Sequence, residues 1–83
     1  MWIRSQNGEY LINTNYFEIG EYEDDDKSLV FDIDARVEDR WVTLGTYSTK
    51  EKALKVLDEI EETMCCGNEF YQMPKDDEVE DDE

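Results

Sequence analysis

The strongest hydrophobic pattern in the chain has a helical period and ends near residue 64. Apolar residues recur three and four positions apart and form one stripe: Ala53, Leu54, Val56, Leu57, Ile60 and Met64. Ser48 is the predicted N-cap, because Glu51 follows three residues later and completes a capping box. Gly67 is the predicted residue just past the helix end, where a left-handed conformation is common. The pattern therefore predicts one amphipathic helix with a buried face.

The residues before this helix alternate between apolar and polar in the manner of β-strands. The predicted strands are residues 1–6, 10–13, 16–23, 28–37 and 41–47. Asn7-Gly8 is a strong hairpin signal, and Glu38-Asp39-Arg40 predicts a second tight hairpin. Gly20 predicts a bulge or bend within its strand.

Several antiparallel strands followed by one helix predict an α+β fold. We expect an antiparallel β-meander of about five strands, with the C-terminal helix packed across its apolar face. Phe70, Tyr71 and Met73 are too apolar for a free tail and should fold back onto the body. Residues 1–75 are therefore predicted to form a single domain. Residues 76–83, DDEVEDDE, are predicted to be a disordered acidic tail because their charges repel one another.

Charge narrows the range of partners. The 83 residues include 24 acidic and 8 basic side chains, which gives a net charge of −16. Such a field repels nucleic acids and anionic membranes, so the expected partner is a basic protein surface. No apolar run is long enough to span a bilayer, and the opening residues MWIRSQ do not resemble a signal peptide. The expected location is cytoplasmic.

The chemistry available to the chain is limited. There is no histidine, and the two cysteines, Cys65 and Cys66, are adjacent, so a disulfide between them would be strained and two free thiols are expected. The chain lacks the spaced cysteine pairs of a zinc site, and it lacks the glycine turn and the terminal glutamate of a calcium-binding loop. Acidic pairs are abundant, but the pattern shows no pocket that would raise one carboxyl pKa against another. We therefore expect no metal, no cofactor and no enzymatic activity.

The charged face of the strand 28–37 is the most specific candidate site. Asp32 and Asp34 lie two positions apart on a strand, which spaces their carboxylates by about 6.6 Å, a separation of the same order as that between backbone phosphates. Such a row could dock in a groove built for nucleic acid, although a solvated face kept charged for solubility explains the same pattern. The predicted partner-binding residues are Glu18, Tyr22, Asp24, Asp25, Asp26, Asp32 and Asp34.

Three segments resemble a known group of proteins. The opening MWIRSQ, the central LGTYSTKEKALKVLDEIEE and the late FYQMPKDDEV are similar to short, uncharacterised proteins of Firmicutes and their phages or mobile elements. The similarity covers the two ends and the helix, and it leaves out the acidic strands between Glu18 and Arg40. The resemblance implies a bacterial or phage setting and carries no catalytic residue over to this chain.

Two functions from different classes follow. The first is a small acidic inhibitor that blocks a nucleic-acid-binding host defence enzyme, of the anti-CRISPR or anti-restriction type, by presenting carboxylates to its basic groove. The second is a non-enzymatic accessory or adaptor domain that recruits a partner through the helix face or the acidic tail. Steep release of the partner at rising salt is expected only of the first. The sequence does not indicate an oligomeric state.

Overall fold

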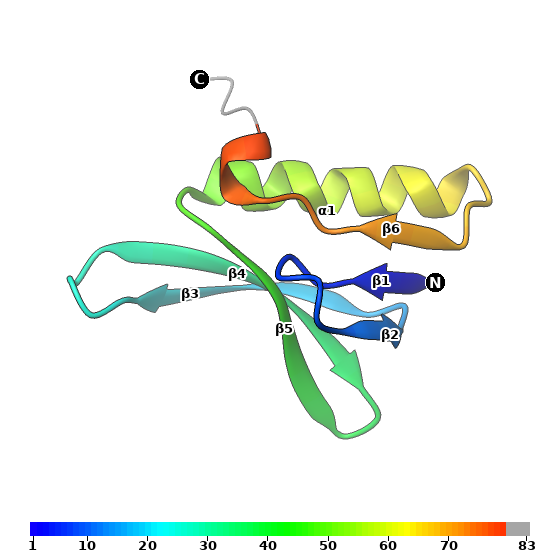
Figure 1. Ribbon diagram of the computed structural model, residues 1–83, viewed down its shortest axis with the longest axis horizontal. Helices are drawn as coiled ribbons and strands as arrows, with labels where there is room; N and C mark the ends of the chain where they lie inside the picture. The colour runs from blue at the N-terminus through cyan, green and yellow to red at the C-terminus, as the bar shows by residue number, and fades with distance from the viewer. Residues whose placement is uncertain (80–83) are drawn as a thin grey trace.

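The computed structural model describes residues 1–79, which form six strands, one α-helix and one short 3₁₀-helix (Figure 1). In chain order these are β1 (Trp2–Arg4), β2 (Leu11–Asn13), β3 (Phe17–Glu23), β4 (Leu29–Val37), β5 (Arg40–Tyr47), α1 (Lys50–Cys65), β6 (Phe70–Gln72) and η1 (Asp76–Glu78). The predicted α+β class is confirmed, and the helix follows the first five strands as expected.

The strands form two three-stranded sheets, ordered β2-β1-β6 and β3-β4-β5. β1 pairs antiparallel with β2, and β4 with β5, in agreement with the two predicted hairpins; β3 also pairs antiparallel with β4. β6 adds a strand that pairs in parallel with β1, so that Trp2 lies opposite Phe70. The first sheet is therefore mixed, and the chain returns to its own N-terminal strand after the helix.

Gln6 joins the two sheets through both its backbone and its side chain. Its backbone N–H donates to the Leu44 carbonyl at 2.7 Å, and its amide both donates to the Thr46 carbonyl and accepts from the Thr46 N–H, each at 3.0 Å. The same amide donates to the Pro74 carbonyl at 3.2 Å. Gln6 thus satisfies the edge of β5 in the way a neighbouring strand would.

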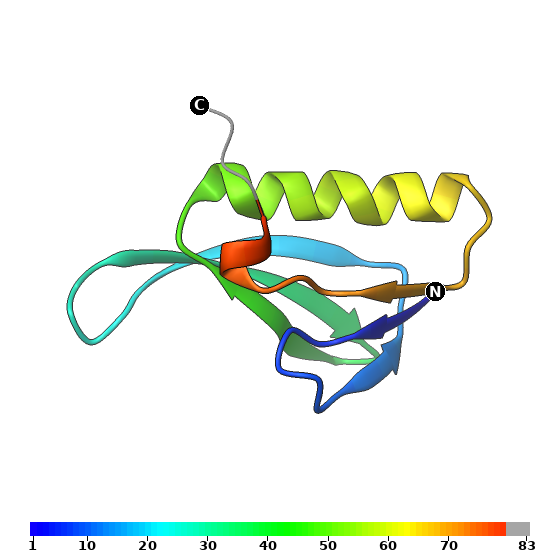
Figure 2. The same cartoon turned by 45° about the horizontal axis from the view of Figure 1, so that its top comes forward.

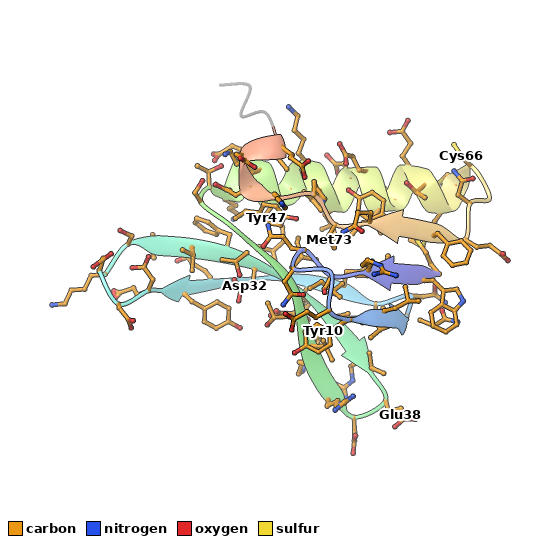
Figure 3. All side chains as sticks on the ribbon, viewed as in Figure 1. Tyr10, Asp32, Glu38, Tyr47, Cys66 and Met73 are labelled. Carbon is orange, nitrogen blue, oxygen red and sulfur yellow. The ribbon has the colours of Figure 1, made fainter. Side chains whose placement is uncertain are left out.

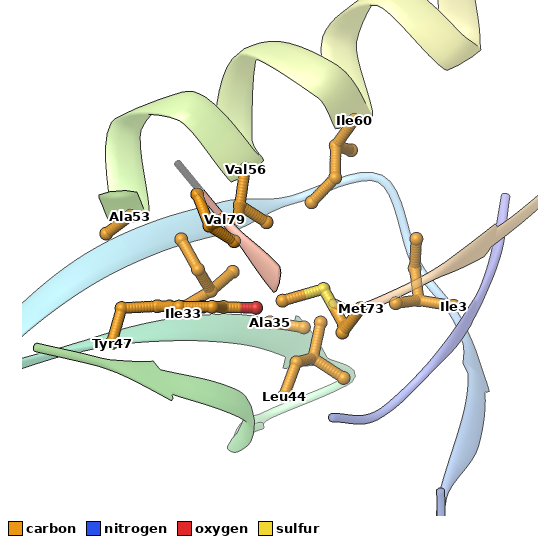
Figure 4. Packing of buried hydrophobic residues seen from close by; sticks show 10 residues of the cluster. All are labelled: Ile3, Ile33, Ala35, Leu44, Tyr47, Ala53, Val56, Ile60, Met73 and Val79. Atoms are coloured by element: carbon orange, nitrogen blue, oxygen red, sulfur yellow. The ribbon is translucent and has the colours of Figure 1, made fainter. Parts of the chain in front are cut away.

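The core lies between α1 and the two sheets (Figures 2 and 4). Its fully buried members are Ile3, Ile33, Ala35, Leu44, Tyr47, Ala53, Val56, Ile60 and Met73, with Val79 at the margin. From α1, Ala53, Val56 and Ile60 point into this core, and Leu57 packs against it half-buried. Leu54 is 43% exposed, so the predicted apolar stripe is too wide on that side, and Met64 in the last turn of α1 is 38% exposed.

The helix ends differ from the prediction at one end and agree with it at the other. Thr49, not Ser48, is the N-cap: its backbone is extended, and its side-chain hydroxyl oxygen accepts the Lys52 N–H at 3.1 Å. Gly67 lies past the C-terminus with φ of +80°, and its N–H bonds to Met64 while Asn68 bonds back to Thr63. This pair of hydrogen bonds is the Schellman arrangement, which confirms the predicted role of Gly67.

The chain after α1 returns along the body. Met73 is buried and Tyr71 is half-buried, as expected, whereas Phe70 is 66% exposed. The expectation of disorder differs from the structure at residues 76–79, because η1 forms there and Val79 is buried. Residues 80–83, the rest of that predicted tail, lie outside the described part of the chain.

Gly20 does not form a bulge, because β3 pairs with β4 in unbroken register. The irregularity lies instead between β4 and β5, where Leu44 is the extra residue between the pairs Ile33–Gly45 and Asp34–Thr43. A Cβ at Gly20 would lie 2.8 Å from the ring of Tyr22. Glycine is needed here because the tyrosine ring lies directly over the backbone.

Candidate functional site

The face of the β3-β4-β5 sheet that is turned away from α1 contains four of the seven predicted site residues. Ile33 and Ala35 of β4 point into the core, so the alternate residues Asp32 and Asp34 point to the opposite side. Strand register places other side chains in rows beside them. We call this surface the open face; its residues are Tyr16, Glu18, Gly20, Tyr22, Val30, Asp32, Asp34, Arg36, Trp41, Thr43 and Thr46.

Asp34 lies in the middle of the open face but is only 9% exposed. Its carboxylate accepts hydrogen bonds from the Thr43 hydroxyl at 2.9 Å and from the Tyr22 hydroxyl at 3.3 Å. Little of the Asp34 carboxylate is therefore accessible for the predicted partner contact, because Tyr22 folds across Gly20 and covers it. Asp34 instead holds Tyr22 and Thr43 in place.

Asp32 is half-buried in the adjacent row (Figure 3). Burial raises the pKa of its carboxyl group, the Thr46 hydroxyl opposes that shift, and the negative charge of Asp34 adds to it. The Oδ1 atom is buried without a hydrogen-bond partner among residues 1–79. Burial of the charged Asp32 carboxylate therefore lowers the stability of the fold, and a cation bound at this face would offset that loss.

Glu18 and Tyr22 are the predicted site residues that the structure leaves accessible on the open face. Glu18 is exposed and accepts the Tyr16 hydroxyl at 3.1 Å, which raises the pKa of Tyr16. Tyr22 is 50% exposed, and the charge of Asp34 raises the pKa of its hydroxyl. Both tyrosines are therefore neutral donors at physiological pH.

Asp24, Asp25 and Asp26 lie apart from the open face, in the turn at the far end of the β3–β4 hairpin (Figure 1). Asp24 Oδ1 accepts the backbone N–H groups of Asp26 at 3.0 Å and Ser28 at 2.9 Å, so this carboxylate shapes the turn. Asp25 and Asp26 are exposed at its tip. The seven predicted residues therefore form two groups, a face and a tip.

Sequence reasoning did not assign Tyr16, Arg36 and Trp41 to the site. The Tyr16 and Trp41 rings meet edge to face with centroids 5.7 Å apart, and the Arg36 guanidinium lies 5.5 Å from the Trp41 centroid. Trp41 is nonetheless 45% exposed and Tyr16 is 53% exposed. The alternation of side chains along the strands could have placed them on this face, because the β4–β5 hairpin puts Trp41 opposite Arg36 on the charged side of β4.

Residues 1–79 contain no group of three or more histidine, cysteine, aspartate or glutamate side chains placed to hold a metal ion. Cys65 and Cys66 are exposed free thiols at the end of α1 (Figure 3). Within the same residues, no helix has the length and apolar character needed to cross a bilayer.

No protein-family model, curated protein or solved structure matches this chain.

Proposed function

We propose that this protein is a non-enzymatic inhibitor that binds the basic groove of a nucleic-acid-binding enzyme. The target class is a host defence enzyme such as a CRISPR effector or a restriction nuclease. The resemblance of the chain ends and helix to phage and mobile-element proteins favours that setting. The electrostatic part of the proposal rests on the structure.

The observation that carries the proposal is the lack of internal ion pairing along the β3–β4 hairpin. Between residues 1 and 79 the one salt bridge joins Lys52 to Asp76, at the start of α1. Arg36 of β4 is engaged with the Trp41 ring and the Glu38 carbonyl, and Lys27 in the turn of the hairpin forms no salt bridge with another of the described residues. The carboxylates of the hairpin therefore keep their charge available for an external cation.

The backbone that carries these carboxylates is ordered. Glu18 lies on the open face, and Glu23, Asp25 and Asp26 lie near or at the tip of the projecting hairpin. β3 positions Glu18 and Glu23, and the Asp24 hydrogen bonds shape the turn that carries Asp25 and Asp26, so this backbone need not be ordered when it meets a lysine- or arginine-lined groove. Exposed Tyr16, Tyr22 and Trp41 add the aromatic contacts that are enriched at binding hot spots.

Plaque counts test the proposal. Phages that a CRISPR or restriction system normally restricts should form plaques more efficiently on hosts that express this protein. A variant with Glu23→Gln, Asp25→Asn and Asp26→Asn should lose that effect, because it loses three exposed charges and keeps the Asp24 turn contacts. Unchanged plaque counts across hosts with several defence systems would contradict the proposal.

A salt-graded pull-down from an infected lysate separates this function from an adaptor role. A partner held by the acidic hairpin should be released steeply as salt screens the contact. A partner that stays bound at high salt would favour recruitment through an apolar surface instead.

A further inference from the structure

β3 has a free edge. It ends its sheet, so among residues 1–79 no strand pairs with its outer side. The bonds from Arg36 N–H to Tyr16 and from Asp24 N–H to Ser28 show that even-numbered residues bond inward to β4. The odd-numbered residues Phe17, Ile19, Glu21 and Glu23 therefore turn their backbone N–H and C=O groups outward.

A groove runs beside the start of this edge, between residues 15–17 and the second half of α1. Its volume is about 330 Å³. The apolar part of its lining comes from Phe17, Leu57, Ile60 and Met64, and Asp58 and Glu61 supply carboxylates. An apolar side chain on a strand added next to β3 would point into this groove, because side chains alternate between the two faces of a sheet.

The charges along the edge select the kind of strand that can pair there. Glu18, Glu21 and Glu23 all lie on β3 and are exposed. Pairing of β3 with a second copy of itself would bring glutamates together, which is destabilising. A strand that carries lysine or arginine would place opposite charges across the new pair, which is stabilising.

We propose that the edge of β3 binds an extended, lysine- or arginine-bearing segment of the partner by strand addition, with an apolar side chain of that segment in the groove beside α1. This inference rests on the proposed function, since it names the binding mode for a basic partner. Backbone hydrogen bonds supply affinity, and the groove and glutamates supply selectivity.

The probe is a seven-residue peptide, matched to the length of β3, in which lysine and valine alternate and both ends are blocked. Two isomers carry N-methyl groups on the lysine amides or on the valine amides. In an added strand only one of these sets faces β3, so one isomer should bind at least about tenfold more weakly than the other. In the bound state the amide protons of Phe17, Ile19, Glu21 and Glu23 should exchange more slowly with solvent.

A matched pair of variants tests the edge from the protein side. Glu21→Pro removes an outward N–H that pairs with no strand among residues 1–79, a change that edge strands tolerate, whereas Glu21→Val removes the same charge and keeps the N–H. The proline variant should bind the unmethylated peptide about tenfold more weakly than the valine variant. Circular dichroism and thermal melts of the two variants establish that both fold.

Equal affinity of the two N-methyl isomers, or of the two folded variants, would overturn strand addition. If the peptide still binds in a salt-sensitive way in either case, the electrostatic attraction of the protein to basic partners is supported even though strand addition is not. If no lysine-bearing peptide binds, strand addition is also overturned. The plaque counts test the inhibitor function independently of this result.

Discussion

Asp76 connects the C-terminal segment to the start of α1 through several donors. Its Oδ1 accepts the Ser48 N–H at 2.8 Å and the Ser48 hydroxyl at 3.1 Å, while Lys52 Nζ donates to its carbonyl at 3.0 Å and pairs with Oδ2 at 3.5 Å. Burial acts to raise the pKa of Asp76, but the Ser48 hydrogen bonds and the Lys52 charge outweigh it and lower the pKa. Asp76 is thus stabilised as an anion, in contrast to Asp32.

These two aspartates should affect the pH dependence of stability in opposite directions. The lowered pKa of Asp76 contributes stability that is present above its ordinary value of 3.8 and is lost as pH falls through the folded-state pKa. The raised pKa of Asp32 means that the folded state binds its proton more tightly, so stability declines as pH rises from 3.8 through the folded-state pKa.

Asp76→Asn should therefore reduce the free energy of unfolding at neutral pH, whereas Asp32→Asn should increase it. Both differences from wild type should shrink as pH falls below the ordinary aspartate value of 3.8. Urea unfolding at a series of pH values measures this, with Asp25→Asn as a control at an exposed turn position. Destabilisation by both substitutions at neutral pH would contradict the role assigned to Asp32.

Thr49→Ala should cost about 1 kcal/mol of stability, because it removes the side-chain acceptor of the Lys52 N–H at the helix start. Ser48→Ala is the matched comparison. It removes one exposed hydroxyl bond to Asp76 and keeps the backbone bond to the same oxygen, so it should cost less, about 0.5 kcal/mol. Chemical denaturation of the two variants measures the two losses of stability. A larger loss for Ser48→Ala than for Thr49→Ala would indicate that Ser48 is the N-cap.

Two differences between the predicted and the observed structure at the residue scale, at the helix N-cap and in the burial of Asp34, have physical causes. Ser48-Thr49 offers two adjacent hydroxyls of nearly equal capping preference, and the choice depends on Asp76, which arrives from 28 residues away. The burial of Asp34 depends on the glycine at position 20, which lets the Tyr22 ring fold over it. Neither contact is visible in the local alternation of polar and apolar residues.

At the scale of elements, the burial of α1 predicts where truncation is most costly. Ile60 is 1% exposed within the core, so Ile60→Ala should destabilise the protein by about 2 to 5 kcal/mol. Leu57 is half-buried beside the groove next to β3, so Leu57→Ala should cost less, about 1 to 2 kcal/mol. Urea unfolding of both variants provides the comparison. Equal losses would mean that α1 is rotated about its axis relative to this packing.

The elements themselves were largely predictable because their signals are local. Alternation located β3, β4 and β5 to within a residue or two, and Asn7-Gly8 marked the β1–β2 hairpin. The parallel pairing of β6 with β1 was not predictable, since it joins residues at opposite ends of the chain and β6 is only three residues long. The open face was partly predictable from β4, but the division of the predicted site residues between that face and the tip required the register of the hairpin.

At the scale of the whole molecule, two groups of acidic residues can be altered separately by mutation. The last four residues of the chain are all acidic, and the β3–β4 hairpin carries its own exposed acids. Deletion of residues 76–83 would change both the net charge and the stability of the fold, because Asp76 accepts a hydrogen bond from Ser48 and Val79 is buried. The informative truncation therefore ends the chain after Val79.

Truncation after Val79 should slow association with a basic partner several-fold at low salt and leave the dissociation rate nearly unchanged, because charges beyond the contact act mainly on encounter. The variant with Glu23→Gln, Asp25→Asn and Asp26→Asn removes three charges from the hairpin and should also speed dissociation, since cations of the partner that these acids contact would lose their pairs. Surface plasmon resonance with the partner captured in the pull-down measures both rates, and high salt should remove the association difference. Loss of binding on truncation alone, with normal binding by the hairpin variant, would make the last four residues the ligand and the folded body its carrier.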